Sequence, residues 1–296
     1  MTHHATAAPD LLKALWITAG FAIVEALAGW WSGSLALLSD AGHMISDALA
    51  LGLAAFAGWV AQRPATARHS YGYTRAEVIA ALVNGALLLA VIVGIVVEAI
   101  RRLQNPQPVM GGVVVAVAVL GMAVNVAVAM QLSHRHANAN VRAALLHVTS
   151  DLLGSVAALI AGAVIYFTGW LPIDALLSLA VAALILYSAV RLLREALHVL
   201  MEGVPMHLDI SEVEAALAGI AGVKSVHDLH IWTLSHGIVA LSAHLEVSSL
   251  EAWSAMLDEA GVVLRESYGI EHATLQPEVG TSRRGKEKIC ALELKV

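Results

Sequence analysis

Six long apolar stretches follow one another up to about residue 200, separated by short polar connectors. Each is as long as the roughly 20 residues that a helix needs to cross about 30 Å of hydrocarbon. The predicted helices cover residues 11–31, 35–61, 76–103, 110–132, 141–168 and 171–193. Most tryptophan and tyrosine residues in this part lie near the ends of the stretches, as interfacial aromatic side chains do. The pattern predicts an all-α membrane domain of six transmembrane helices.

The pattern changes after about residue 203, where charged residues become frequent and several apolar runs are short. Amphipathic helices are expected over residues 209–220 and 250–268, with Gly269 as the stop signal of the second. Strands rich in β-branched residues are expected over 223–234, 237–247 and 270–278. The order αββαβ predicts a small α+β domain with helices on one face of a sheet.

Basic residues in the connectors set the expected orientation of the membrane domain. Those on one side are Lys13, Arg63, Arg68, Arg75, Arg135, Arg142, Arg191 and Arg194. Arg101 and Arg102 are exceptions on the opposite side. Both termini are therefore expected in the cytoplasm. The expected domains are an N-terminal tail (1–10), a transmembrane domain (11–203), a cytosolic domain (204–279) and a disordered polar tail (280–296).

Composition agrees with a membrane protein and limits the chemistry available to it. Of 296 residues, 58% are hydrophobic and 14% are charged, and the mean hydropathy is +0.75; a soluble domain carries about 25% charged residues. Cys290 is the single cysteine, so a thiolate cluster is excluded and any metal site must use histidine and carboxylate side chains. The H-E-x-x-H motif of metalloproteases and the G-x-x-x-x-G-K-[ST] loop of ATPases do not occur.

Two of the apolar stretches contain the same pair of polar residues, His-x-x-x-Asp. The second stretch carries His43 and Asp47, and the fifth carries His147 and Asp151. A spacing of four residues places both side chains of a pair on one helical face, one turn apart. If the two helices faced each other, two imidazoles and two carboxylates would meet at one point. Tetrahedral nitrogen and oxygen ligation of this kind suits Zn²⁺.

Carboxylates inside these apolar helices need a stabilising partner. An aspartate near the bilayer centre costs roughly 2.5–3.5 kcal/mol on translocon-insertion scales. Asp40, Asp47 and Asp151 have no Lys or Arg close by in their own helices, so a bound dication or bound protons would offset the cost. The alternative is a structural role, in which such side chains cap a helix or hydrogen-bond a neighbouring helix. Two copies of the motif favour the metal site.

Three other polar positions in the apolar stretches allow more than one interpretation. Asp40 shares the helical face of His43 and Asp47, and it could cap the helix, hydrogen-bond a metal ligand or relay protons. Glu25 and Asn125 are interpreted as helix–helix hydrogen bonds rather than metal ligands.

Several segments together resemble the cation diffusion facilitator family, and the resemblance covers nearly the whole chain. It is carried by residues 32–47, 69–77, 140–151 and 227–232. The resemblance implies a homodimeric metal/proton antiporter whose six spans precede a ferredoxin-like cytosolic domain. It also implies a transport site made of His43, Asp47, His147 and Asp151. In this family a histidine at the position of His43 is associated with preference for Zn²⁺, with Cd²⁺ or Co²⁺ as secondary substrates.

The resemblance extends to residues of the cytosolic domain. It implies a regulatory metal site that uses His227, His244 and His272, for which surface or strand-packing histidines are the alternative. It also implies an ion pair between Arg75 and Glu202 that ties the spans to the soluble domain.

The sequence therefore predicts an integral membrane protein that is a transporter and not an enzyme. Its expected activity is proton-coupled efflux of Zn²⁺ from the cytoplasm by alternating access, with Zn²⁺ as substrate and no organic cofactor. The expected partners are divalent metal ions, protons, the lipid bilayer and a second copy of the chain, with no nucleic acid. A bacterial inner membrane is the expected location. The alternatives are a membrane-tethered metal sensor that does not transport and an exporter of a broader range of divalent metals.

Overall fold

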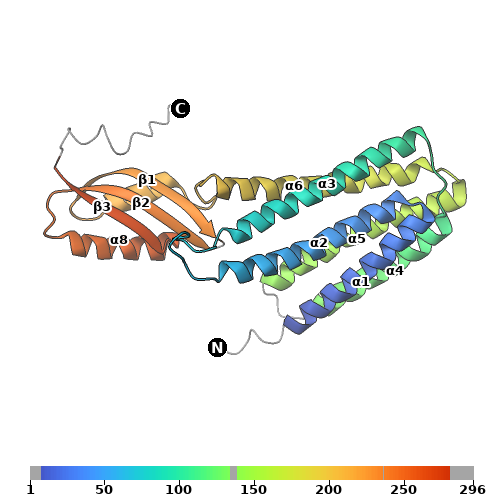
Figure 1. The fold of residues 1–296 in the computed structure, drawn as a ribbon, viewed down its shortest axis with the longest axis horizontal. Helices are drawn as coiled ribbons and strands as arrows, with labels where there is room; N and C mark the ends of the chain where they lie inside the picture. Colours follow the sequence, from blue (N-terminus) through green and yellow to red (C-terminus); the bar gives the residue numbers. More distant parts are fainter. Residues whose placement is uncertain (1–7, 134–138, 236, 281–296) are drawn as a thin grey trace. The chain divides into compact units, whose positions relative to one another are not determined.

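Six long helices precede a small mixed domain in the computed structural model of the chain (Figure 1). The structure describes residues 8–133, 139–235 and 237–280; the side chains at 8–15, 131–133, 139–147, 149 and 150 lie outside this description. Residues 1–7 and 281–296, which make up most of the two predicted tails, also lie outside it. The helices are α1 (Ala8–Ser32), α2 (Leu35–Ala61), α3 (Ala76–Gln104), α4 (Gly111–Ser133), α5 (Ala139–Thr168) and α6 (Pro172–Leu200).

Within the described residues, five helices are long and apolar enough to cross a membrane: α2, α3, α6 and the segments Gly111–Met130 of α4 and Asp151–Thr168 of α5. The sixth, α1, has 25 residues. Large apolar side chains such as Trp30, Val93 and Leu184 point outward from these helices and are about half exposed or more. Such a surface is stable against lipid and not against water. The predicted fold class, six membrane helices followed by a small α+β domain, is confirmed.

Small residues let the helices approach one another closely, as is usual in membrane bundles. Where α4 and α5 run side by side, Ala118, Ala158 and Ala161 are fully buried (Figure 1). A Cβ atom at Gly162 would lie 2.9 Å from the backbone nitrogen of Val115, so this approach requires glycine. Ala182 and Ala189 of α6 are likewise buried against α3.

The small domain contains a three-stranded sheet and two helices. Its elements are α7 (Ile210–Ala218), β1 (Val223–Ser235), β2 (Ile238–Val247), α8 (Trp253–Tyr268) and β3 (His272–Val279). The strand order is β1-β2-β3, with β1 and β2 antiparallel and β2 and β3 parallel. Leu217 of α7 and Leu264 of α8 share one apolar core with Leu241 and Leu245 of β2. Because successive strand residues point to opposite faces, Ser242, His244 and Glu246 lie on the face away from that core.

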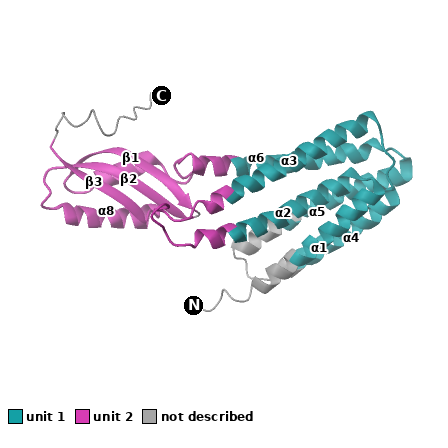
Figure 2. Ribbon diagram, in the orientation of Figure 1, with its two compact units in different colours: residues 1–56, 80–193 teal, residues 57–79, 194–296 magenta. Residues whose placement is uncertain are grey.

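The chain divides into two compact units, which Figure 2 shows in different colours. Unit 1 holds Met1–Phe56 and Ala80–Leu193, and unit 2 holds Ala57–Ile79 and Arg194–Val296. Unit 2 therefore contains the small domain together with the end of α2, the start of α3 and the end of α6. Side-chain contacts hold it together, because Ser235 Oγ donates to Glu77 Oε2 at 2.9 Å and Arg75 pairs with Glu202.

Candidate metal centre

Three of the four side chains predicted for the transport site lie close together in unit 1. Nε2 of His43 is 3.5 Å from Oδ2 of Asp47, one turn further along α2, and 3.9 Å from Oδ1 of Asp151 on α5. One ligand atom from each residue lies within 4.8 Å of the other two. Asp151 is fully buried, whereas His43 and Asp47 keep about a fifth of their side-chain surface exposed. One imidazole and two carboxylates from two helices can bind a divalent cation.

The fourth predicted ligand, His147, belongs to α5, one turn before Asp151. Its side chain lies outside the described residues. The helical backbone nevertheless places residues 147 and 151 on the same face of α5.

Asp40 lies three residues before His43 on α2 and is 2% exposed. Ser155 Oγ donates to Asp40 Oδ2 at 3.5 Å, and Asn125 Nδ2 donates to Ser155 Oγ at 3.3 Å. The Asn125 bond links α4 to α5, as the sequence predicted. A Cβ atom at Gly154 would overlap the Asp40 carboxylate, so glycine lets α5 approach this acid.

Glu25 on α1 is the least expected member of this region. Its side chain is completely buried, and no N–H or O–H group of the described residues donates to either of its oxygens. The group that faces it is another carboxyl, that of Asp40, and Asp151 also acts on it electrostatically. An ordinary interhelical hydrogen bond, as expected from the sequence, therefore does not account for Glu25.

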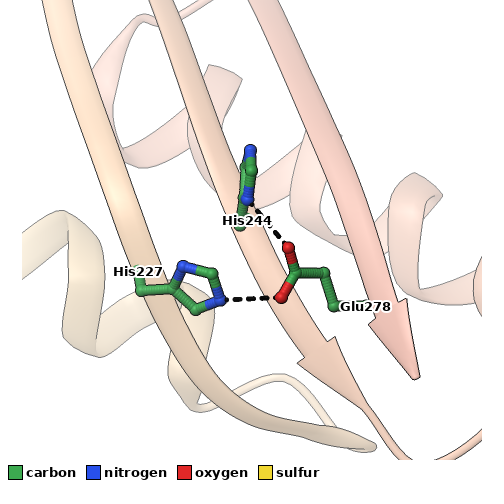
Figure 3. Close-up of side chains that lie close together, drawn as sticks. All are labelled: His227, His244 and Glu278. Atoms are coloured by element: carbon green, nitrogen blue, oxygen red, sulfur yellow. Dashed lines mark hydrogen bonds and ion pairs between the residues drawn. The ribbon is translucent and has the colours of Figure 1, made fainter. Parts of the chain in front are cut away.

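A second group of metal-binding type lies on the exposed face of the sheet in unit 2 (Figure 3). His227 of β1 and His244 of β2 are register partners, and their ring centroids are 5.3 Å apart. Glu278 of β3 reaches both, with Oε2 at 3.1 Å from His227 Nε2 and Oε1 at 3.0 Å from His244 Nδ1. Two imidazoles and a carboxylate from three adjacent strands form a preorganised set of three ligands.

Glu278 was absent from the sequence prediction, although it lies at the centre of this group. The missing information was the parallel pairing of β3 with β2, which places Gln276 opposite His244 and Glu278 two residues further on the same face. A carboxylate near the end of the last strand was the available signal.

Asp228 approaches His244 from the other side. Its Oδ2 is 3.8 Å from His244 Nε2, and its Oδ1 is 3.1 Å from His230 Nε2. The residue has a φ of 52°, and the pairing of β1 with β2 is irregular between His227 and His230. A left-handed aspartate at such an irregularity re-aims a side chain at a local backbone cost. His244 is thus held between two carboxylates, a common arrangement around metal-binding histidines.

His272, the third histidine predicted for the cytosolic site, is not one of the three residues that come together. It starts β3, opposite Ala240. Its ring stands edge-on to the ring of Tyr71, with centroids 6.0 Å apart. Tyr71 belongs to the connector between α2 and α3, so His272 contacts the membrane-proximal part of unit 2.

The remaining predicted pair, Arg75 and Glu202, lies at the edge of the same unit. Arg75 Nη2 is 2.9 Å from Glu202 Oε1, and both side chains are more than a third exposed. Glu202 follows the end of α6 with a left-handed φ of 57°.

Two family models match this chain, one over each domain. Residues 11–201 match the model described as the cation efflux transmembrane domain. Residues 205–279 match the cation efflux protein cytoplasmic domain. The chain belongs to the cation efflux family, also called cation diffusion facilitators. It is therefore an integral membrane protein that moves metal cations out of the cytoplasm, and it is not an enzyme.

Relatives in this family carry names that describe metal transport. The zinc transporter ZitB of Escherichia coli K12 is 44% identical over 271 residues, which cover 90% of this chain and 86% of the relative. The cadmium, cobalt and zinc/H(+)-K(+) antiporter of Bacillus subtilis 168 is 38% identical over 289 residues, or 95% of this chain and 91% of the relative. The zinc transporter ttm-1 of Caenorhabditis elegans is 38% identical over 290 residues, or 90% of this chain and 71% of the relative.

Proposed function

We propose that this cation efflux protein exports Zn²⁺ in exchange for protons. In this proposal the cation binds between α2 and α5 to His43, Asp47, His147 and Asp151, and crosses by alternating access. The observation that carries the proposal is the convergence of His43, Asp47 and Asp151 from two membrane helices. The names of the ZitB relative and of the Bacillus antiporter support zinc as cargo and protons as the exchanged ion.

Charge balance favours a divalent cation at this position. Two neutral imidazoles and two ionised carboxylates carry a charge of −2, which a bound Zn²⁺ cancels in the dry interior of the membrane domain. Four protein ligands would complete a tetrahedral shell without water, which suits transport and leaves no position for an activated water molecule. Other divalent ions that accept imidazole and carboxylate ligands remain competing substrates.

Proton exchange follows from the same ligands. Binding requires neutral imidazole and ionised carboxylate groups, so protons and Zn²⁺ compete for them. An unperturbed histidine has a pKa of about 6.5. A modest difference in pH between the two sides of the membrane can therefore change whether the imidazole is protonated. A site facing inward would take up metal and release protons, and a site facing outward would do the reverse.

We further propose that the group His227, His244 and Glu278 binds metal in the cytoplasm and regulates transport. Three ligand atoms already lie within 4.8 Å of one another, so the strands do not have to rearrange to bind a cation. This group also bears on the alternative of a sensor that does not transport. A sensor needs only the cytosolic ligands, whereas the buried acids of α2 and α5 serve no purpose in it.

The remaining assignments are also proposals. The termini face the cytoplasm, the membrane is the inner membrane of a bacterium, and two copies of the chain form the working transporter. Arg75 and Glu202 tie the start of α3 to the chain that follows α6, as their distance of 2.9 Å permits.

Zinc flux into proteoliposomes of the full-length protein tests the transport site. The variant Asp47→Ala should lose flux driven by a pH gradient while keeping its elution volume and its cytosolic zinc site. The matched control is Glu98→Gln, which removes a carboxylate of α3 that pairs with Arg102 and not with the site. Flux at the normal rate in Asp47→Ala would overturn the assignment, and flux that ignores the pH gradient in the unaltered protein would overturn proton exchange.

A further inference from the structure

A pair of buried carboxyl groups lies beside the proposed transport site without belonging to it. Glu25 of α1 is 0% exposed, and Asp40 of α2 is 2% exposed. Each carboxyl lies close enough to the other to act on it electrostatically, and both Glu25 oxygens are buried without a hydrogen-bond partner among the described residues. Two carboxylates cannot hydrogen-bond each other unless a proton lies between them, and two ionised carboxylates in contact repel in a medium of low dielectric.

The other elements packed around the pair supply no positive charge among the described residues. Asp151 of α5 adds a third acid that acts on both carboxyls. Asn125 of α4 and Ser155 of α5 are neutral, and Ser155 Oγ donates to Asp40. Within the described part of the chain, no Lys or Arg forms an ion pair with Glu25 or Asp40. The nearest group that can become positive on the same helix is His43, one turn from Asp40.

The charge of the transported metal does not remove this problem. A Zn²⁺ ion held by two histidines and two aspartates is already balanced by Asp47 and Asp151. Glu25 and Asp40 are therefore left over, and ionising both inside the bundle would cost several kcal/mol. Glu25, with both oxygens buried and no donor among the described side chains, requires a cation of its own.

We propose that Glu25 and Asp40 form a second cation-binding site, which holds one proton between their carboxyl groups. This inference rests on the proposed antiport and adds the carrier of one coupled proton, separate from the metal ligands. A proton fits better than a larger monovalent ion because both carboxyls are buried and, among the described residues, a single hydroxyl donates to the pair.

The pair communicates with the metal through charge and not through a shared ligand. When the transport site is empty, the negative charge of Asp151 near the pair favours the bound proton. When Zn²⁺ binds, two positive charges arrive near Asp151, and the proton leaves Asp40 and Glu25 for the aqueous side that is open. When a proton returns to the pair, it disfavours the cation by the same interaction.

The count of protons released per zinc bound tests the site. Full-length protein in weakly buffered detergent solution is titrated with ZnCl₂ while a pH dye reports the release. Glu25→Gln keeps the shape of the side chain and cannot carry the proton. It should release about one proton fewer per zinc than the unaltered protein, with an affinity for zinc within about threefold because Glu25 is not a ligand. Protons from the cytosolic histidines contribute equally to both proteins and cancel in the difference.

Two further variants, Asp40→Asn and Glu98→Gln, and a comparison of KCl with NaCl complete the test. Asp40→Asn should give the same loss as Glu25→Gln, which covers the case in which one variant does not fold, and Glu98→Gln should give none. An unchanged proton count in Glu25→Gln and Asp40→Asn overturns the proposal. The salt series tests whether the site holds potassium instead. The proposal of a bound proton would be wrong if zinc binding were weaker in KCl than in NaCl, if Glu25→Gln removed this difference, and if the number of released protons did not change. Failure of the transport site itself would appear elsewhere, as normal zinc binding in Asp47→Ala.

Discussion

Two buried acids of unit 1, Asp174 and Glu25, have opposite surroundings. Asp174 of α6 is 2% exposed and Glu25 of α1 is 0% exposed. The carboxylate of Asp174 accepts from Ser34 Oγ at 2.6 Å, from the amide of Leu35 at 2.6 Å and from the amide of Ala36 at 3.2 Å. Glu25 faces the carboxyl of Asp40 and has no such donors in the described residues.

Asp174 acts as a cap that α6 supplies to the first turn of α2. The first N–H groups of a helix lack internal partners and carry partial positive charge, so a carboxylate placed there is stabilised. Arg102 of α3 adds to this junction, since its Nη1 donates to the carbonyl of Gly33 and lies 3.8 Å from Asp174 Oδ2. Arg102 was one of the two basic residues that did not fit the charge pattern of the connectors. Its contacts with Gly33 and Asp174 explain its position.

The difference separates a carboxylate that stabilises the fold from carboxylates that we propose bind ions. Where donors already satisfy every oxygen, as at Asp174, no further cation is needed. Where buried acids lie near each other and have few donors among the described residues, as Glu25 and Asp40 do, bound protons or metal ions would balance their charge. Burial alone does not reveal which of the two roles an acid has, because the hydrogen-bond partners decide it.

The largest expected effect comes from removing the charge of Asp151, an acid that we propose binds the metal ion. Asp151→Asn should lower zinc flux in proteoliposomes by more than about 100-fold, because the cation loses a ligand and the site loses half of its negative charge. The melting temperature of the protein in detergent without zinc should rise or stay constant, since a buried acid is removed. Normal transport by Asp151→Asn, or a loss of stability as large as that expected for Asp174→Asn, would show that Asp151 has a structural role like that of Asp174.

The next effect concerns the carboxylate between two histidines in the small domain. Glu278→Gln keeps hydrogen bonding to one imidazole but removes the anionic ligand, so cytosolic zinc affinity should fall about 10- to 100-fold. Equilibrium zinc titration of the full-length protein would show a lower affinity at the cytosolic site and an unchanged affinity at the transport site. Glu246→Gln is the matched control, because Glu246 shares the strand face and pairs with Ser225 instead. Equal effects of both variants would count against a metal role for Glu278.

Asp174→Asn should show the signature of a structural acid. The amide group of asparagine can accept from Ser34 but presents N–H toward the amide of Leu35, leaving a buried donor unsatisfied. A cost of about 1–3 kcal/mol is expected, which thermal unfolding in detergent would register as a lower melting temperature. The number of protons released per zinc bound should not change. A change in that number would mean that Asp174 also takes part in ion coupling, and the distinction drawn from its donors would fail.

The sequence was sufficient for the elements and for the intramembrane motif. Apolar length alone predicted helix α2 at its observed limits, Leu35–Ala61. The spacing of four residues placed His43 beside Asp47 because both lie on one helix, where geometry is fixed by local sequence. The approach of Asp151 to His43 needed two helices to face each other, and the repeated motif made that expectation reasonable.

The parts that could not be predicted all depend on pairing between distant segments. Leu35 and Asp174 are 139 positions apart, and His244 and Glu278 are 34 apart on strands whose parallel pairing had not been derived. Nor could the sequence say that the partner of Glu25 is an acid, since this requires knowing which face of α1 meets α2. Local patterns indicate that a polar residue is buried, but only tertiary packing decides whether a donor or an acceptor meets it.

The smallest effect is expected at an ion pair that water can reach. Arg75 and Glu202 are 38% and 61% exposed, so their attraction is screened and should contribute less than about 1 kcal/mol. Arg75→Glu and Glu202→Arg should each lower zinc flux by no more than about fivefold, and the double variant should recover part of the loss. The recovery matters more than the size of the loss, because Glu202 also has a left-handed backbone that any substitution could disturb. Two single losses that simply add in the double variant would show that the side chains act separately, and that the contact of 2.9 Å contributes no coupling between α3 and the chain after α6.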